Sequence, residues 1–140
     1  MGDSNSIIRA FLMGQSGITD IVEDRIYCPR LPQNATLPAL GFFTRGGTST
    51  PYIPYLVEPS IQFDCWAEGA SAPMVARGLY MAIYDALQGI QNESVVVGSD
   101  TFHILSAIEE VQGQDLQDID IPKYFRVLAF FKILINTKED

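Results

Sequence analysis

The side chains able to do chemistry are few and scattered along this sequence. The chain has one histidine, His103, and two cysteines, Cys28 and Cys65. A nucleophilic cysteine needs a neighbour that stabilises its thiolate. Cys65 shares a strand face with Ile61 and Phe63, so we expect it in the core. His103 lies within an alternating strand pattern, where a histidine is usually a half-buried structural residue. A pairing of Cys28 with His103 is the catalytic arrangement that stays open.

Metal and phosphate sites are no better supported. Asp115, Asp118 and Asp120 are closely spaced, but the glycine and the final glutamate of an EF-hand loop are missing at the required positions. The Gly46-Gly47 pair opens no helix and is not followed by Lys-Ser or Lys-Thr, as a phosphate-binding loop would be. We therefore predict no catalytic residue, no metal and no cofactor, and a protein that is not an enzyme.

Length, composition and charge narrow the class of protein. The 140 residues are 47% hydrophobic with eight phenylalanines, which predicts one folded domain over residues 1–140. The formal net charge is −8, so phosphate backbones are repelled and sequence-specific DNA binding is disfavoured. We expect no signal peptide and no membrane span, and two reduced thiols in a protein made in the cytoplasm.

The clearest predicted element among those that position these side chains is residues 61–68. They alternate apolar and polar, which predicts a half-buried strand. Apolar residues then recur at helical spacing from Val75 to Leu87. Ser71 is a candidate N-cap, Pro73 fits the first turn and Gly89 fits the C-terminal end. A strand followed by such a helix predicts that the helix packs on its own sheet.

The rest of the chain alternates short helical and extended patterns. We expect a first helix from Ser4 or Asn5 to about Gln15, then a helical turn at residues 18–22. Strand patterns follow at residues 26–28, 40–45, 94–97 and 102–109, then an acidic linker and the longest strand, residues 123–137. The predicted fold is α+β, a mostly antiparallel mixed sheet of about four to five strands with helices packed on one face.

Two regions have the composition of contact surfaces. Residues 46–59 form a long, nearly uncharged connection after a strand that ends at Gly46-Gly47, and the connection is either functional or an idle loop. Both faces of the last strand are apolar, so it is central or meets another subunit. The candidate interface residues are Tyr52, Ile53, Tyr55, Leu56, Leu128 and Phe130.

The succession of motifs resembles the tail-completion proteins of long-tailed phages, also called tail terminators or tail-to-head joining proteins. The resemblance extends over nearly the whole chain and rests on structural motifs. They are Asp24-Arg25-Ile26-Tyr27, the proline-broken run from Leu31-Pro32 to Pro38-Ala39-Leu40, Ile61-Gln62-Phe63-Asp64-Cys65-Trp66-Ala67, the helix end Ala86-Leu87-Gln88-Gly89, and Pro122-Lys123-Tyr124-Phe125-Arg126-Val127.

The resemblance implies a virion protein of the tail or neck. Such a subunit forms a homo-oligomeric ring, typically a hexamer, that caps the tube of major tail protein, ends tube growth and offers a surface to the head connector. DNA passes through the ring without sequence-specific binding. Clustered acids would repel that DNA over about 8–10 Å at ordinary salt. The candidate lumen-lining residues are Glu109, Glu110, Asp115, Asp118 and Asp120.

Other functions stay open at this point. A head-side neck or connector adaptor belongs to the same structural class. A small α+β ligand-binding or catalytic domain using Cys28 or His103 belongs to a different class, and its activity would survive in the monomer. A host domain unrelated to phages is a third reading.

Overall fold

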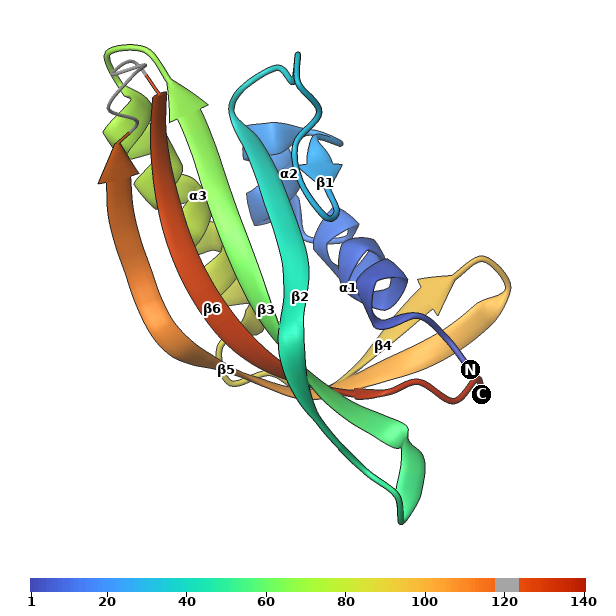
Figure 1. Cartoon of the computed structure of the whole chain (residues 1–140). Helices are drawn as coiled ribbons and strands as arrows, with labels where there is room; N and C mark the ends of the chain where they lie inside the picture. Colours follow the sequence, from blue (N-terminus) through green and yellow to red (C-terminus); the bar gives the residue numbers. More distant parts are fainter. Residues whose placement is uncertain (118–123) are drawn as a thin grey trace.

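A computed structural model describes residues 1–117 and 124–140. Its elements, in chain order, are α1 (Ser4–Met13), α2 (Ser16–Val22), β1 (Ile26–Tyr27), β2 (Ala39–Thr50), β3 (Ile53–Glu68), α3 (Ala72–Leu87), β4 (Gln91–Val97), β5 (Asp100–Gln117) and β6 (Tyr124–Asn136). Six strands form one curled sheet in the order β1-β2-β3-β6-β5-β4 (Figure 1). Neighbouring strands are antiparallel except β1 and β2.

The core lies between the helices and one face of the sheet. Helix α3 packs against β3, β5 and β6, while α1 contacts β1 and β4. Phe63 is fully buried, and its ring meets Phe42 at 6.1 Å and Phe131 at 5.6 Å. Cys65 is also fully buried, as its strand face predicted. The α+β class and the mostly antiparallel sheet are confirmed, with six strands instead of four to five.

Local sequence explains where the helices begin and end. Helix α1 is capped by the Asp3 carboxylate, which accepts from the Ser6 N–H at 3.1 Å, so the cap precedes the predicted Ser4 or Asn5. Ser71 occupies the N-cap position of α3, but its side chain makes no capping hydrogen bond. Gly89 has a φ of +76° just after α3, the conformation expected of a glycine at a helix end.

The expectation of a long loop at residues 46–59 is wrong. Strand β2 does not end at Gly46-Gly47 but bulges there, because Thr44 pairs with Ile61 while Gly47 pairs with Pro59. Both glycines have positive φ, +80° and +137°. β2 then continues to Thr50 and returns as β3, so the segment is a β-hairpin that projects past the rest of the sheet (Figure 1).

The acidic segment also differs from the expectation. β5 continues through Glu109, Glu110 and Asp115, so these residues belong to a strand and not to a linker. Asp118 and Asp120 lie outside the described residues. β6 lies between β3 and β5, so the central position, one of the two alternatives for this strand, is confirmed. It is not the longest strand: it has 13 residues, whereas β5 has 18. Pairing with β6 overrides the low strand propensity of the acidic residues in β5.

Candidate functional site

The three candidate reactive side chains are held apart. His103 Nε2 lies 2.7 Å from the Asp140 carboxylate, and its Nδ1 lies 3.5 Å from the Ser94 hydroxyl. Cys28 follows β1 at one edge of the sheet, whereas His103 is on β5 near the other edge. The fold therefore does not bring Cys28 and His103 together.

Both thiols are kept protonated by their surroundings. Burial raises the pKa of Cys28, and the nearby Asp3 carboxylate raises it further. Complete burial raises the pKa of Cys65 far above its ordinary value. A thiol with a raised pKa is a poor nucleophile at neutral pH. Across residues 1–117 and 124–140, no three His, Cys, Asp or Glu side chains form a group that could hold a metal ion. No helix in this part of the chain is long and apolar enough to cross a membrane.

The sheet face opposite the helices is the first extended surface. Leu128 and Phe130 lie on this face of β6, opposite Asp64 and Gln62 of β3, and each is partly exposed. The Arg45 guanidinium lies 5.1 Å from the centre of the Phe130 ring, a cation–π contact. This open face therefore carries apolar side chains, two of them predicted as interface residues, and none of the helices in the described part of the chain covers them.

A charged side chain is almost buried within this open face. Asp64 is only 8% exposed, accepts from the Gln62 amide at 3.1 Å and lies 3.6 Å from Arg126. Burial raises the pKa of the Asp64 carboxyl, and this effect exceeds the opposite effects of Gln62 and Arg126. Arg126 also lies 4.9 Å from the centre of the Trp66 ring. Polar and aromatic groups thus hold one another in place across β3 and β6.

The hairpin tip is the second surface. Tyr52 is 91% exposed and Ile53 is 53% exposed, at the turn between β2 and β3. Tyr55 is also exposed, and the Lys138 ammonium lies 5.2 Å from the centre of its ring. Leu56 is already half-buried, where β3 begins to pair with β6. The predicted cluster is therefore split: Tyr52 and Ile53 form the tip, while Tyr55 and Leu56 lie at its base.

The acidic residues of β5 point to both sides of the sheet. Glu109 accepts a hydrogen bond from the Tyr80 hydroxyl of α3, and Asp115 lies 3.2 Å from Arg77 of the same helix. Glu110 lies in a register shift of β5 and accepts from the Ser60 hydroxyl of β3 at 2.7 Å. These three carboxylates therefore do not form one continuous patch on a single subunit. Their role in lining a channel stays a prediction.

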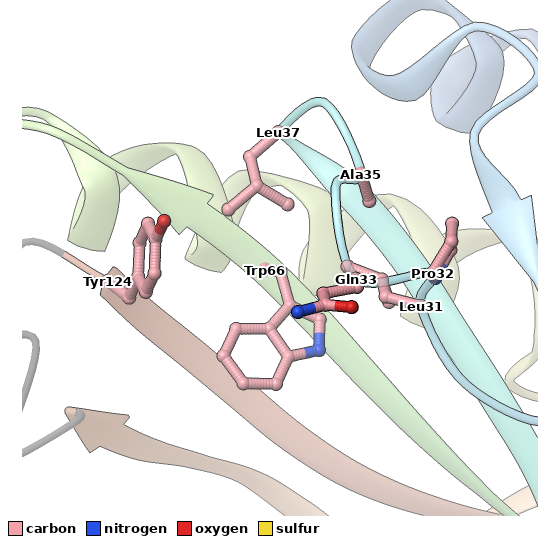
Figure 2. A pocket seen from close by; sticks show the side chains of 7 residues that line it. All are labelled: Leu31, Pro32, Gln33, Ala35, Leu37, Trp66 and Tyr124. Atoms are coloured by element: carbon pink, nitrogen blue, oxygen red, sulfur yellow. The ribbon is translucent and has the colours of Figure 1, made fainter.

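An apolar pocket lies near the end of the sheet opposite the hairpin. Its volume is about 230 Å³, and Figure 2 shows the side chains that converge on it. They come from the proline-rich segment before β2, from the end of β3 and from the start of β6: Leu31, Pro32, Gln33, Ala35, Leu37, Trp66 and Tyr124. The proline-rich segment lies close to β2, because a Cβ on Gly41 would come within 2.8 Å of Leu31 Cδ1.

Sequence reasoning did not single out this pocket. Its members are up to 93 positions apart, from Leu31 to Tyr124, so no local spacing connects them. The available signal was compositional: a proline-broken segment with two leucines that has no strand or helix of its own. Apolar residues in such a segment must pack on a neighbouring element or stay exposed.

Comparison with known proteins adds a likeness of fold. No family model matches the chain, and no curated protein matches it. Among solved structures, the chain is similar to a protein chain in the virion of a native gene transfer agent (GTA) particle. The match has a TM-score of 0.64 at 12% sequence identity and covers 98% of this chain and 95% of the other. The two chains therefore share their fold over almost their full lengths.

Proposed function

We propose that this protein is a structural virion protein of a phage-like tail. Six copies form a ring that caps the tail tube, ends its polymerisation and joins the tail to the head connector. Its partners are further copies of itself, the major tail tube protein and the head completion protein. The DNA moves through the ring without sequence-specific binding. The function is assembly and not catalysis.

The observation that carries this proposal is the full-length likeness of the fold to a virion chain. The motif resemblance, which comes from the sequence and not from the structure, likewise implies a virion protein. The geometry adds support, because Tyr52 and Ile53 are exposed at a projecting hairpin tip, and Leu128 and Phe130 are partly exposed on an open sheet face. A subunit inside an assembly needs such surfaces on more than one side.

The acidic side chains of β5 have a place in this proposal. Within each subunit Glu109 and Asp115 contact α3 and Glu110 contacts β3, so neighbouring subunits would have to form the channel lining together. In the proposed ring these carboxylates, with Asp118 and Asp120, surround the channel, where their negative charge keeps passing DNA from adhering. A structure of the assembled ring with these residues on its outer rim would refute this part of the proposal.

The test is electron microscopy of a lysate from phage that carry a stop codon early in this gene. Free heads beside tubes of uncontrolled length are the expected result, because no ring would end tube growth. Complementation with the intact gene is the control and should restore normal particles.

Other appearances of the lysate have distinct meanings. Tubes of normal length that fail to join filled heads would replace the terminator with a connector adaptor on the head side. Intact virions of normal proportions would overturn the structural role altogether.

A further inference from the structure

Two uncharged apolar features lie toward opposite ends of strand β3. The hairpin tip, Tyr52 and Ile53, is at the start of the strand, and Trp66 of the apolar pocket is near its end. Thirteen residues of extended chain span roughly 40 Å, at about 3.3 Å per residue. Because one strand carries both features, the tip of a subunit cannot enter the pocket of the same subunit.

The hairpin tip needs a partner that the single chain does not supply. Residues 46–57 carry no charged side chain, although 19% of the whole chain is charged. Leu56 is the residue nearest the tip that β3 pairs with β6, so the ribbon beyond it has two strands only. Such a ribbon is marginally stable alone in water. Exposed apolar side chains on it indicate burial in a contact.

The pocket has the size and chemistry to take one such side chain. At about 230 Å³ it is smaller than ordinary ligand pockets, which span about 300–1,000 Å³. Among the described residues that line it, none has a charged side chain. Leu37, Trp66 and Tyr124 present apolar surface around it (Figure 2). An aromatic ring entering this space would contact hydrophobic walls, and its hydroxyl would find Gln33 at the rim.

Charge favours a second copy as the occupant. Copies with a net charge of −8 repel each other. Electrostatic repulsion therefore opposes a contact between them least where both surfaces are uncharged. The tip and the pocket are two such surfaces, and they are unlike. A contact between unlike surfaces repeats head to tail, and it closes into a ring when the rotation allows. A two-fold dimer would instead make the tip–pocket contact twice between the same two copies, and growth would stop at two.

We propose that the β2–β3 hairpin tip of one subunit inserts Tyr52 into the apolar pocket of the next, and that this contact connects the ring. The inference rests on the proposed ring function and names the contact that builds it. The pocket is then a socket for protein and not a ligand site.

Cross-linking the full-length protein tests the contact. The background variant is Cys28→Ser, in which Cys65 is the remaining thiol and is fully buried. Ile53→Cys, at the tip beside an intact Tyr52, and Gln33→Cys are added together, and the protein is treated with a short bismaleimide. We expect a ladder of covalent oligomers, because each chain carries both halves of the contact. The matched control combines Ile53→Cys with Met74→Cys, since Met74 of α3 is 78% exposed and lies outside the pocket.

The rates of the two cross-linking reactions decide the outcome. Faster linking through Gln33 than through Met74 supports the contact. Equal rates overturn it, and so does preferential linking of Ile53→Cys to Ile53→Cys in single-cysteine chains, because that places two tips against each other. Covalent dimers that extend no further also overturn it, because they indicate a reciprocal two-fold contact and not a ring.

A mixing experiment tests the head-to-tail geometry. Tyr52→Asp places a charge at the tip, and Ala35→Asp places a charge in the pocket, so each disrupts one half of the contact. We expect each variant alone to lose self-association, while an equimolar mixture forms one-to-one dimers and nothing larger, because only one intact tip and one intact pocket meet. Met74→Asp should leave association unchanged. Rings formed by either single variant, or a mixture that stays monomeric while the unsubstituted protein associates, would overturn the inference.

Failure of the inference can be told from failure of the proposed function. If the stop-codon phage have defective tails but cross-links form elsewhere, the ring function stands and this contact falls. If the cross-links form through Gln33 while the stop-codon phage assemble normally, the contact stands and the tail function falls.

Discussion

Asp64 shows how a single side chain is held in an unfavourable state on the open sheet face. Its pKa is raised by burial, so the folded protein binds the proton more tightly than the unfolded chain. The contribution of Asp64 to stability is therefore greatest at pH values below its unfolded pKa. It falls as the pH rises through the raised folded pKa. Above that raised pKa the ionised carboxylate destabilises the fold, and Arg126, 3.6 Å away, offsets this in part.

Asp64→Asn is expected to unfold at a higher urea concentration than the unsubstituted protein at pH 7. The amide keeps an acceptor for Gln62 and removes the buried charge. The difference should shrink as the pH falls through the raised pKa of Asp64, because the aspartate then becomes protonated. Urea unfolding at several pH values checks this, with Asp85→Asn of α3 as the control. A variant that is less stable at pH 7 would mean that the Arg126 contact outweighs burial.

His103 is expected to be a structural residue of small effect. Its contact with Asp140 is partly exposed to solvent, at 23% and 59% of the two side chains, and such contacts contribute less than about 1 kcal/mol. His103→Gln should therefore change the free energy of unfolding little and leave ring assembly intact. Phe131→Ala, at a fully buried position, should cost about 3–5 kcal/mol. Urea unfolding and electron microscopy measure both. Loss of assembly on His103→Gln would reopen a functional role for the histidine.

The β2–β3 hairpin depends on the bulge at its base. Gly46 and Gly47 both have positive φ, a conformation that costs other residues about 1–2 kcal/mol. The two differ in their surroundings. A Cβ on Gly47 would lie 2.3 Å from the Glu58 carbonyl oxygen, whereas a Cβ on Gly46 would meet nothing within 4 Å. The close approach of the two strands at Gly47 is what aims the projecting ribbon.

Gly47→Ala is therefore expected to destabilise the hairpin more than Gly46→Ala. Gly46→Ala is destabilised only by the unfavourable positive φ. Gly47→Ala has that effect and also a steric clash with the β3 backbone. Amide hydrogen exchange over residues 48–57 should rise in Gly47→Ala, while exchange in β6 changes little. Thermal unfolding of both variants gives the matched comparison. Equal effects would show that the two strands separate at no cost.

The whole molecule has a net charge of −8, which sets how copies approach one another. If the contact between copies is uncharged, repulsion opposes it and salt should strengthen it. The Debye length falls from about 10 Å at 0.1 M to about 3 Å at 1 M. Sedimentation velocity across this range should show tighter self-association at higher salt, with Tyr52→Asp as the control that stays dissociated. Weaker association at high salt would mean that ion pairs hold the copies together.

The sequence by itself determined much of the secondary structure and the layer arrangement. Local periodicity was enough to predict α3, the alternating part of β3 and β6 as a helix and strands. The reason is that side-chain direction in a helix or strand repeats at a fixed interval. The core positions of Cys65 and Phe63 followed from the same alternation. The exposed, uncharged character of Tyr52 and Ile53 was also visible as composition.

Only the tertiary structure decided what these segments become. The glycines at residues 46–47 look like a strand end, yet pairing with β3 satisfies the backbone on both sides of a bulge and extends the hairpin. Glu109 and Asp115 look like a linker, yet β6 on one side and the partners on α3 hold them in β5. The pocket brings Leu31, Trp66 and Tyr124 together. Contacts between residues so far apart depend on sheet order, which local spacing does not encode.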